Sequence, residues 1–97
     1  MLTSKQRSNL KSIAANLEPV GQGGKAGIGE NMIKSLSDAL EARELIKVNI
    51  LTNAEEDAKT TGAQLAEALR ADCVAVIGRK AIFYRRSSRK DFKHIEF

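Results

Sequence analysis

The residues best placed to do chemistry lie in a glycine-dense stretch, residues 21–29, which reads Gly-Gln-Gly-Gly-Lys-Ala-Gly-Ile-Gly. It holds five of the seven glycines in this chain of 97 residues. Glycine permits positive φ angles and the close approach of another backbone, and the free amide N–H groups at the start of a helix bind anions. An amphipathic segment begins at Glu30, and Lys25 lies within the stretch. We therefore expect a loop that binds phosphate groups.

The loop matches neither standard nucleotide-binding motif. Gly24-Lys25 is not followed by Ser or Thr, as a P-loop requires. Gly29 falls too late for the third glycine of a dinucleotide loop, and no long apolar strand precedes it. What remains is Gly24-Lys25-Ala26-Gly27, which has the spacing of the loop with which KH modules clamp a nucleic-acid backbone. The alternative is a connector that needs glycine only for its geometry.

Positive charge is concentrated at the two ends of the chain. The net charge is +4, but residues 1–17 hold three basic residues and no acidic ones, and residues 79–97 hold seven basic and two acidic ones. Residues 18–78 are acidic overall, with six basic and ten acidic residues. Such segregation is typical of a protein that binds a polyanion. The alternative is an ordinary solvated surface with a basic tail.

The chain has few residues that could form a catalytic or metal-binding site. The chain has one histidine, His94, and one cysteine, Cys73, so it cannot form an internal disulfide or a usual four-ligand zinc site. Cys73 begins an apolar strand and is best explained as a small core residue, while the run Glu55-Glu56-Asp57 is typical of a helix start. Tyr84 could stack on a base, although strand tyrosines more often pack in the core. We expect no enzyme, no cofactor and no small-molecule substrate.

The elements that must position the loop follow from the apolar spacing. Residues 3–17 are predicted to form a helix, capped by Thr3 or Ser4, that is basic outside and apolar inside. Pro19 ends it, and Val20 begins a short extended stretch before the glycines. The clearest helix runs from Glu30 to Arg43, and a third runs from about residue 54 to 70, with its core face formed by Ala58, Leu65, Ala66 and Leu69.

Three further segments have the pattern of strands. Residues 45–51 alternate around Lys47 and Asn49, and residues 73–77 and 81–85 form a hairpin around Gly78-Arg79-Lys80. The order α-β-α-β-α-β-β predicts an α/β (α+β) two-layer sandwich. We expect residues 1–86 to form a single domain. Residues 87–97 would form a basic, flexible C-terminal tail, in which Phe92, Ile95 and Phe97 could dock on the domain.

Taken together, several stretches resemble the CRM domain of the YhbY type, whose name refers to chloroplast RNA splicing and ribosome maturation. The resemblance covers residues 2 to about 86, and each motif is weak by itself while the ordered set is specific. In order, the stretches are Leu2-Thr3-Ser4-Lys5-Gln6-Arg7 with Leu10-Lys11, Pro19-Val20 with Gly24-Lys25-Ala26-Gly27, Glu44-Leu45-Ile46-Lys47-Val48, and Val76-Ile77-Gly78-Arg79 with Tyr84-Arg85.

The resemblance implies a compact fold with a four-stranded mixed sheet, similar to the C-terminal domain of a bacterial translation initiation factor. It also implies binding of structured RNA, with ribosomal RNA in precursors of the large subunit as the partner. Where the family usually has an apolar run before the loop, this chain has Gly21-Gln22-Gly23. The expected RNA-binding residues are Gly24, Lys25, Ala26, Gly27, Lys5, Arg7, Lys11, Lys47, Arg79, Lys80, Arg85 and Arg86.

The function expected from the sequence is thus a non-enzymatic RNA-binding protein in large-subunit (pre-50S) assembly. It would recognise the RNA backbone through the glycine loop and a basic surface, with little base stacking and weak sequence discrimination. The alternative is a protein-interaction module that docks an acidic partner through the glycine loop and the following helix. A small nucleotide-binding enzyme is a minor third possibility. With no apolar run of membrane-spanning length and no apolar leader at the N-terminus, we expect a cytoplasmic location.

Overall fold

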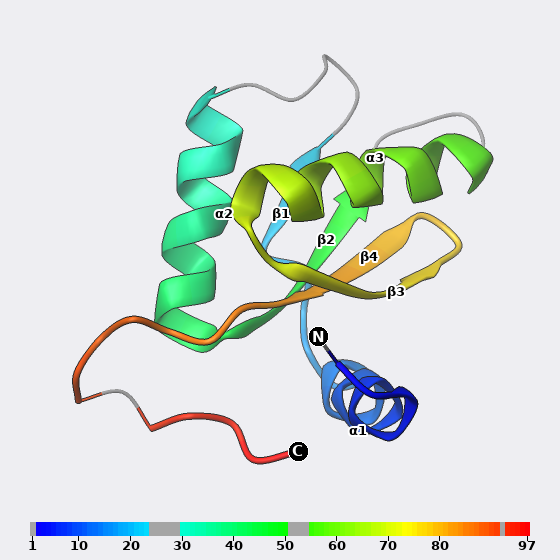
Figure 1. The fold of residues 1–97 in the computed structure, drawn as a ribbon. Coiled ribbons are helices and arrows are strands. Elements are labelled where there is room, and N and C mark those ends of the chain that lie inside the picture. Colours follow the sequence, from blue (N-terminus) through cyan, green and yellow to red (C-terminus); the bar gives the residue numbers. More distant parts are fainter. Residues whose placement is uncertain (1, 24–29, 51–54, 92) are drawn as a thin grey trace.

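The computed structural model describes residues 2–23, 30–50, 55–91 and 93–97, and it has an α+β fold (Figure 1). The elements follow the expected order α-β-α-β-α-β-β. They are α1 (Ser4–Ala14), β1 (Gly21–Gly23), α2 (Glu30–Arg43), β2 (Leu45–Ile50), α3 (Glu55–Leu69), β3 (Asp72–Ile77) and β4 (Lys80–Tyr84).

Helix α1 begins with the predicted cap. The Thr3 hydroxyl accepts the backbone N–H of Gln6, and the Gln6 side chain accepts the backbone N–H of Thr3, at 3.1 and 3.0 Å. This reciprocal pair satisfies two N–H groups that a helix start would otherwise leave without partners. Leu10 and Ala14 are fully buried, whereas Ile13 remains 38% exposed. The apolar stripe that packs on the sheet is therefore narrower than the sequence indicated.

Strands β2, β4 and β3 form an antiparallel sheet, to which β1 adds a short parallel edge. The strand order is β1-β2-β4-β3. Strand β1 pairs with β2 over only three residues, from Gly21 opposite Val48 to Gly23 opposite Ile50. The mixed character of the expected sheet thus rests on these three residue pairs. The chain is extended at the glycines themselves.

The two faces of the sheet are both apolar, and each is covered by helix. Ile46, Val48, Ile50, Ala81 and Phe83 face α2 and α3 and form a first core with Leu36, Leu40, Ala58, Leu65, Ala66 and Leu69. The alternate residues Leu45, Ile82 and Tyr84, together with Val74, form a second core with Leu10 and Ala14 of α1. Because successive strand residues point to opposite faces, α1 lies on the face opposite α2 and α3. The expected two-layer arrangement is therefore wrong, since the sheet lies between helices.

Two glycines outside the glycine-dense stretch are required by the geometry. A Cβ atom on Gly62 of α3 would lie 3.2 Å from the Val76 side chain, so glycine lets α3 approach β3 closely. Gly78 has a φ of 61° in the turn between β3 and β4, a conformation that glycine adopts without strain. These two positions hold the hairpin against α3 and turn it at its tip.

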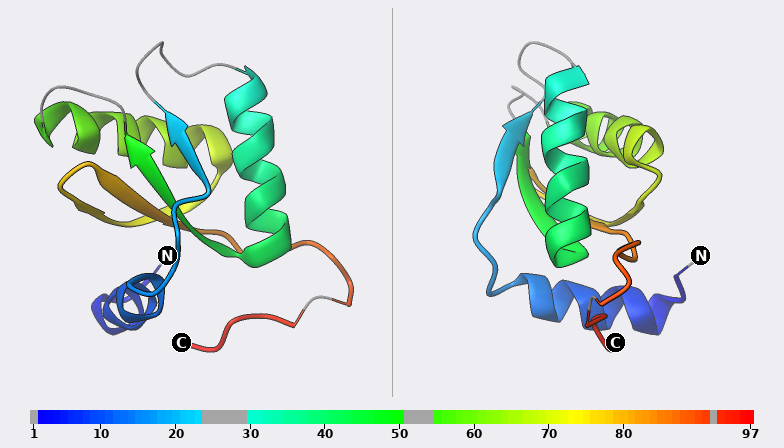
Figure 2. Two further views of the ribbon diagram at one scale, coloured as in Figure 1. Left: turned by 180° about the vertical axis from the view of Figure 1, so that it is seen from behind. Right: turned by 90° about the vertical axis from the view of Figure 1, so that its left-hand side faces the viewer.

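Several of the residues that follow Arg86 pack on the body of the fold, although residues 88–91, 93 and 96 are exposed. Ser87 is 5% exposed, and Ile95 and Phe97 pack against the second core. The chain passes from β4 below α2 and returns toward α1 (Figures 1 and 2). Ile95 and Phe97 thus dock on the domain, as the sequence indicated they could. Phe92 lies outside the described residues. We refer to residues 87–97 as the C-terminal segment.

Candidate nucleic-acid interface

The glycine loop Gly24 to Gly27, with Lys25 and Ala26, lies outside the described residues. The structure does show where the chain enters it. Gly23 pairs with Ile50 at the end of β2, and the Ile50 N–H donates to the Arg79 carbonyl at 2.7 Å. The ends of β1 and β2 and the turn of the β3–β4 hairpin therefore lie at one end of the sheet. The basic residues at that end form the candidate interface.

The face of the sheet against which α1 packs carries two lysines, Lys47 and Lys80, next to Ile77 and Ile82. Lys47 of β2 is opposite Ile82 of β4, and Lys80 is opposite both Asn49 and Ile77. Lys47 and Lys80 alternate along their strands with residues of the first core, so their side chains belong to the opposite face. This face is thus apolar beneath α1 and cationic toward the hairpin turn.

Helix α1 adds a third lysine and completes a small hollow. The hollow has a volume of about 180 Å³ and is lined by Lys11, Ala15, Lys47, Ile77, Lys80 and Ile82. We call it the lysine hollow. Lys11 and Lys80 are exposed and Lys47 is half-buried. The structure thus brings together three predicted RNA-binding lysines from three separate parts of the sequence.

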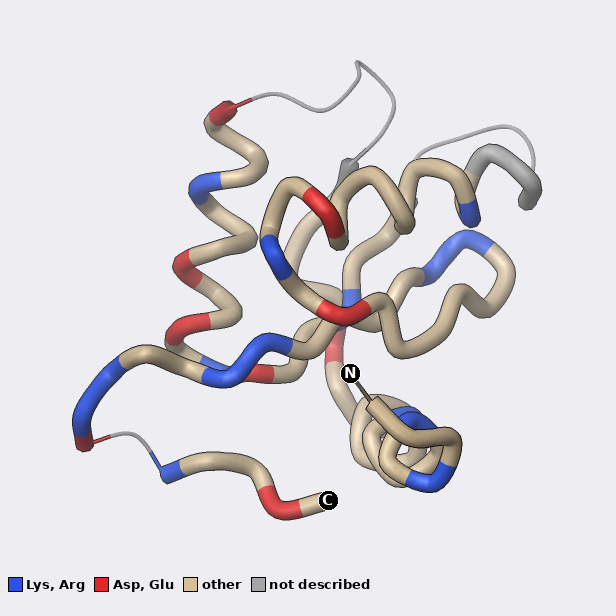
Figure 3. Tube along the Cα trace, in the orientation of Figure 1, with Lys and Arg blue, Asp and Glu red and all other residues tan. Residues whose placement is uncertain are grey.

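The three ammonium groups are available for a ligand. Within the described part of the chain, the side chains of Lys11, Lys47 and Lys80 make no hydrogen bond or ion pair. Among the residues whose side chains the structure describes, acidic ones lie elsewhere, for example Glu30, Asp38 and Glu41 along α2 (Figure 3). Like charges gathered without counter-charges raise the local positive potential and attract polyanions.

Arg7 was expected on the RNA-binding surface, but its guanidinium is used inside the protein. Its Nη1 donates to the Cys73 carbonyl at 2.6 Å, with the Val74 carbonyl at 3.5 Å. The side chain is half-buried between α1 and β3. These carbonyls lie where β3 is irregular, between Cys73 and Ala75. We therefore assign Arg7 to holding α1 against the sheet, and we leave it out of the proposed surface.

Arg85 is also bound internally. Its guanidinium donates to the Leu69 carbonyl at 2.8 Å and to the carbonyl and hydroxyl of Ser37, each at 3.0 Å. It also lies 3.6 Å from the Glu41 carboxylate, and its side chain is only 20% exposed. The arginine joins the end of β4 to α2 and to the end of α3. We leave it, too, out of the proposed surface.

The remaining predicted residues are exposed at different places. Lys5 lies in the first turn of α1, at the end of the helix away from Ala15, and Arg79 lies in the hairpin turn next to Lys80. Arg86 lies just after the last residue of β4, whereas Lys80 is the first residue of that strand. The structure thus places Arg79 with the lysines and Arg86 apart from them.

Sequence reasoning missed two glutamates that anchor the C-terminal segment. Glu44 is fully buried, and its carboxylate accepts the backbone N–H groups of Ser87 and Ile95 at 2.7 and 2.8 Å and contacts Nδ1 of His94. Although burial acts to raise the pKa of Glu44, these hydrogen bonds outweigh it, and the pKa lies below its ordinary value. Glu44 also has a φ of 64°, at a helix end where glycine is usual. The sequence signal for a special role of Glu44 was that a glutamate, and not a glycine, directly follows the helix predicted to end at Arg43.

Glu41 makes the second anchor. Its carboxylate accepts the hydroxyl and the N–H of Ser88, both at 2.7 Å, and the hydroxyl of Ser87 at 3.0 Å. Two hydrogen bonds from Ser88 are the largest causes that lower the pKa of Glu41 to about 2, and Ser87 and the charge of Arg85 add to them. Burial acts in the opposite direction but is outweighed. Both carboxylates are therefore ionised near neutral pH, and neither projects toward the lysine hollow.

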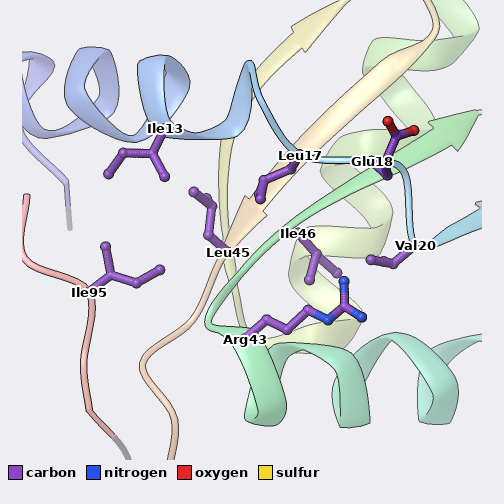
Figure 4. A pocket seen from close by; sticks show the side chains of 8 residues that line it. All are labelled: Ile13, Leu17, Glu18, Val20, Arg43, Leu45, Ile46 and Ile95. Carbon is purple, nitrogen blue, oxygen red and sulfur yellow. The ribbon is translucent and has the colours of Figure 1, made fainter.

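A second hollow, of about 170 Å³, lies where the C-terminal segment meets α1 (Figure 4). Among the described residues, its lining is mostly aliphatic, with one acidic and one basic side chain: Ile13, Leu17, Glu18, Val20, Arg43, Leu45, Ile46 and Ile95. Ile95 forms one wall opposite the end of α1 (Figure 4). This hollow lacks the cationic rim of the lysine hollow.

Within the part of the chain that the structure describes, no three His, Cys, Asp or Glu side chains are grouped so as to hold a metal ion. None of the helices in those residues is both long and apolar enough to span a membrane. Burial raises the pKa of the Cys73 thiol, with a smaller opposing effect of Arg7. Cys73 packs at the edge of the first core, as a small core residue would.

Comparison with known proteins identifies relatives of the whole fold. Residues 2–85 match the family described as the CRS1 / YhbY (CRM) domain. The chain is 46% identical over 96 residues to "Probable RNA-binding protein YqeI" of Bacillus subtilis, covering 99% of this chain and 98% of that protein. It is 34% identical over 86 residues to a Pseudomonas aeruginosa protein that is also named a probable RNA-binding protein, covering 89% and 83%.

A solved structure agrees with these sequence matches. The solution structure of a Staphylococcus aureus protein, described as a candidate RNA binder, superposes with a TM-score of 0.82 at 48% identity. The match covers 94% of this chain and 95% of that one. The chain fold and the sequence thus point to the same set of relatives.

Proposed function

Because the chain belongs to the CRS1/YhbY (CRM) domain family, we propose that it is a non-enzymatic RNA-binding protein. The observation that carries the proposal is the convergence of Lys11, Lys47 and Lys80 around one hollow, without counter-charges among the described residues. Lysine ammonium groups bind phosphates by charge, so contacts of this kind give affinity with little sequence discrimination.

The proposed surface extends along one end of the sheet. Arg79 and Lys80 lie at the hairpin turn, beside the strand end from which the chain enters Gly24-Lys25-Ala26-Gly27. The loop's part in binding remains a prediction from the sequence, with backbone N–H groups and Lys25 contacting phosphates. If it is right, Lys25→Glu weakens RNA binding, and unchanged affinity would remove the loop from the surface.

We propose ribosomal RNA in precursors of the large subunit as the partner. The support is the family resemblance, whose name refers to ribosome maturation, together with a surface suited to a highly charged and structured polyanion. Because phosphate contacts release bound counterions, the affinity should fall steeply as salt rises.

Co-sedimentation with ribosomal particles tests this function. We expect the protein to travel with large-subunit precursors at low salt, to leave them at high salt, and to be released by RNase. Retention after RNase treatment would favour the alternative of an acidic protein partner. Absence from the particles at every salt concentration would contradict the proposed ribosomal role.

A further inference from the structure

The lysine hollow has a feature that phosphate binding does not explain, namely an apolar floor. Three apolar side chains contribute to the lining: Ile82, which is 3% exposed, Ala15, which caps the end of α1, and Ile77, which is 51% exposed at the end of β3. A phosphate seated inside would face hydrocarbon, and burying a charge without hydrogen-bond donors is unfavourable. The ammonium groups reach the rim on long aliphatic stems, which themselves add apolar surface.

We infer that this hollow takes one unpaired nucleobase of the RNA, with the neighbouring phosphates on the three lysines. The inference rests on the proposed RNA-binding function and names the part of the RNA that is recognised. A base has flat apolar faces and is joined to a phosphate on each side, which matches an apolar floor within a cationic rim. In a duplex the bases are stacked inside, so a single-stranded or bulged nucleotide is required.

The hollow is small. Its volume of about 180 Å³ lies below the range of roughly 300–1,000 Å³ that is usual for sites of drug-sized ligands. None of the described residues that line the hollow is aromatic. The base is therefore held by aliphatic contact rather than by ring stacking, and all four bases should be accepted with similar affinity. Preference for unpaired over paired RNA is the expected specificity.

Ile77 gives the sharpest test because its side chain is exposed and its loss should not disturb the core. Fluorescence anisotropy at one salt concentration would compare three labelled RNAs: a single strand, its perfect duplex, and the same duplex with one bulged nucleotide. We expect the wild-type protein to bind the single-stranded and bulged RNAs at least about threefold more tightly than the perfect duplex. Ile77→Ser should abolish most of this preference.

Ile13→Ser is the matched control, since Ile13 is an exposed isoleucine, at 38%, outside the lysine hollow. It should keep the preference for unpaired RNA, and thermal melts should show that both variants are folded. A bulged RNA with an abasic site at the bulge keeps every phosphate and should bind like the perfect duplex. Equal affinity of the wild-type protein for the three RNAs, or an unaltered preference in Ile77→Ser, would overturn this inference while leaving RNA binding intact. Failure to bind any of the RNAs at low salt would overturn the proposed function as well.

Discussion

The carboxylate of Glu44 accepts the backbone N–H of Ile95 at 2.8 Å, joining positions 51 residues apart in the chain. The same carboxylate accepts the N–H of Ser87. One buried side chain at the end of α2 thus fixes both ends of the C-terminal segment. The segment in turn covers the second core, where Phe97 meets Tyr84 edge-on with ring centroids 4.9 Å apart.

We predict that Glu44→Gln destabilises the protein and releases the C-terminal segment. An amide has one acceptor oxygen and brings N–H groups toward the donors that the carboxylate now satisfies, so the expected loss is on the order of 3 kcal/mol. Urea unfolding measures it. Tyr84 is the only tyrosine and there is no tryptophan, so tyrosine fluorescence reports the Phe97 contact directly. Glu67→Gln, at an exposed position on α3, should change neither signal. An unchanged midpoint for Glu44→Gln would show that the carboxylate does not anchor the segment.

Acid should weaken the same contacts. The pKa of Glu41 is lowered from 4.5 to about 2, and that of Glu44 is also lowered. A carboxylate with a lowered pKa in the folded state contributes stability that is complete above its unfolded pKa and is lost as the pH falls toward the folded pKa. We therefore expect stability to decline from about pH 4.5 toward pH 2. Urea midpoints measured across this range should decline less in Glu41→Gln. Parallel decline in the variant and the wild-type protein would exclude Glu41 as a cause.

Arg85 should affect stability rather than RNA binding. Arg85→Gln removes hydrogen bonds to the Leu69 carbonyl and to Ser37, and hydrogen bonds from charged groups contribute about 1.5–3 kcal/mol. We expect a loss of stability of this size in urea unfolding. RNA affinity at fixed salt should change no more than in Arg89→Gln, which removes the same charge from an exposed position of the C-terminal segment. A much larger loss of affinity in Arg85→Gln, in protein shown to be folded, would return Arg85 to the interface.

Much of the fold could be predicted from local patterns. Apolar periodicity gave the bounds of α2 as observed and those of β2 and α3 to within one residue at either end, and the Thr3 cap follows from residue type. The layering could not be predicted in the same way. Strict alternation of apolar and polar residues along a strand would indicate a sheet with one covered face. Strand β2 lacks it, because the neighbouring residues Leu45 and Ile46 are both apolar and both buried.

The candidate site was only partly predictable for a related reason. Lys47 and Arg85 are both basic residues on strands, and composition assigns them the same role. The fold directs Lys47 to the lysine hollow and surrounds Arg85 with the Leu69 and Ser37 carbonyls. Whether a cation is available for a ligand depends on acceptors that are distant in the sequence, and a single sequence does not reveal them.

The most direct test of the central claim is the salt dependence of RNA binding by the triple variant Lys11→Gln, Lys47→Gln, Lys80→Gln. Its control, Lys34→Gln, Lys59→Gln, Lys90→Gln, has the same net charge and alters exposed lysines outside the hollow. With single-stranded RNA, each lost phosphate contact should reduce the slope of log affinity against log salt by about 0.7. We predict a slope about two units shallower and much weaker binding for the first variant, with the control close to wild type. Equal slopes and affinities for the two variants would contradict the lysine hollow as the RNA-binding site.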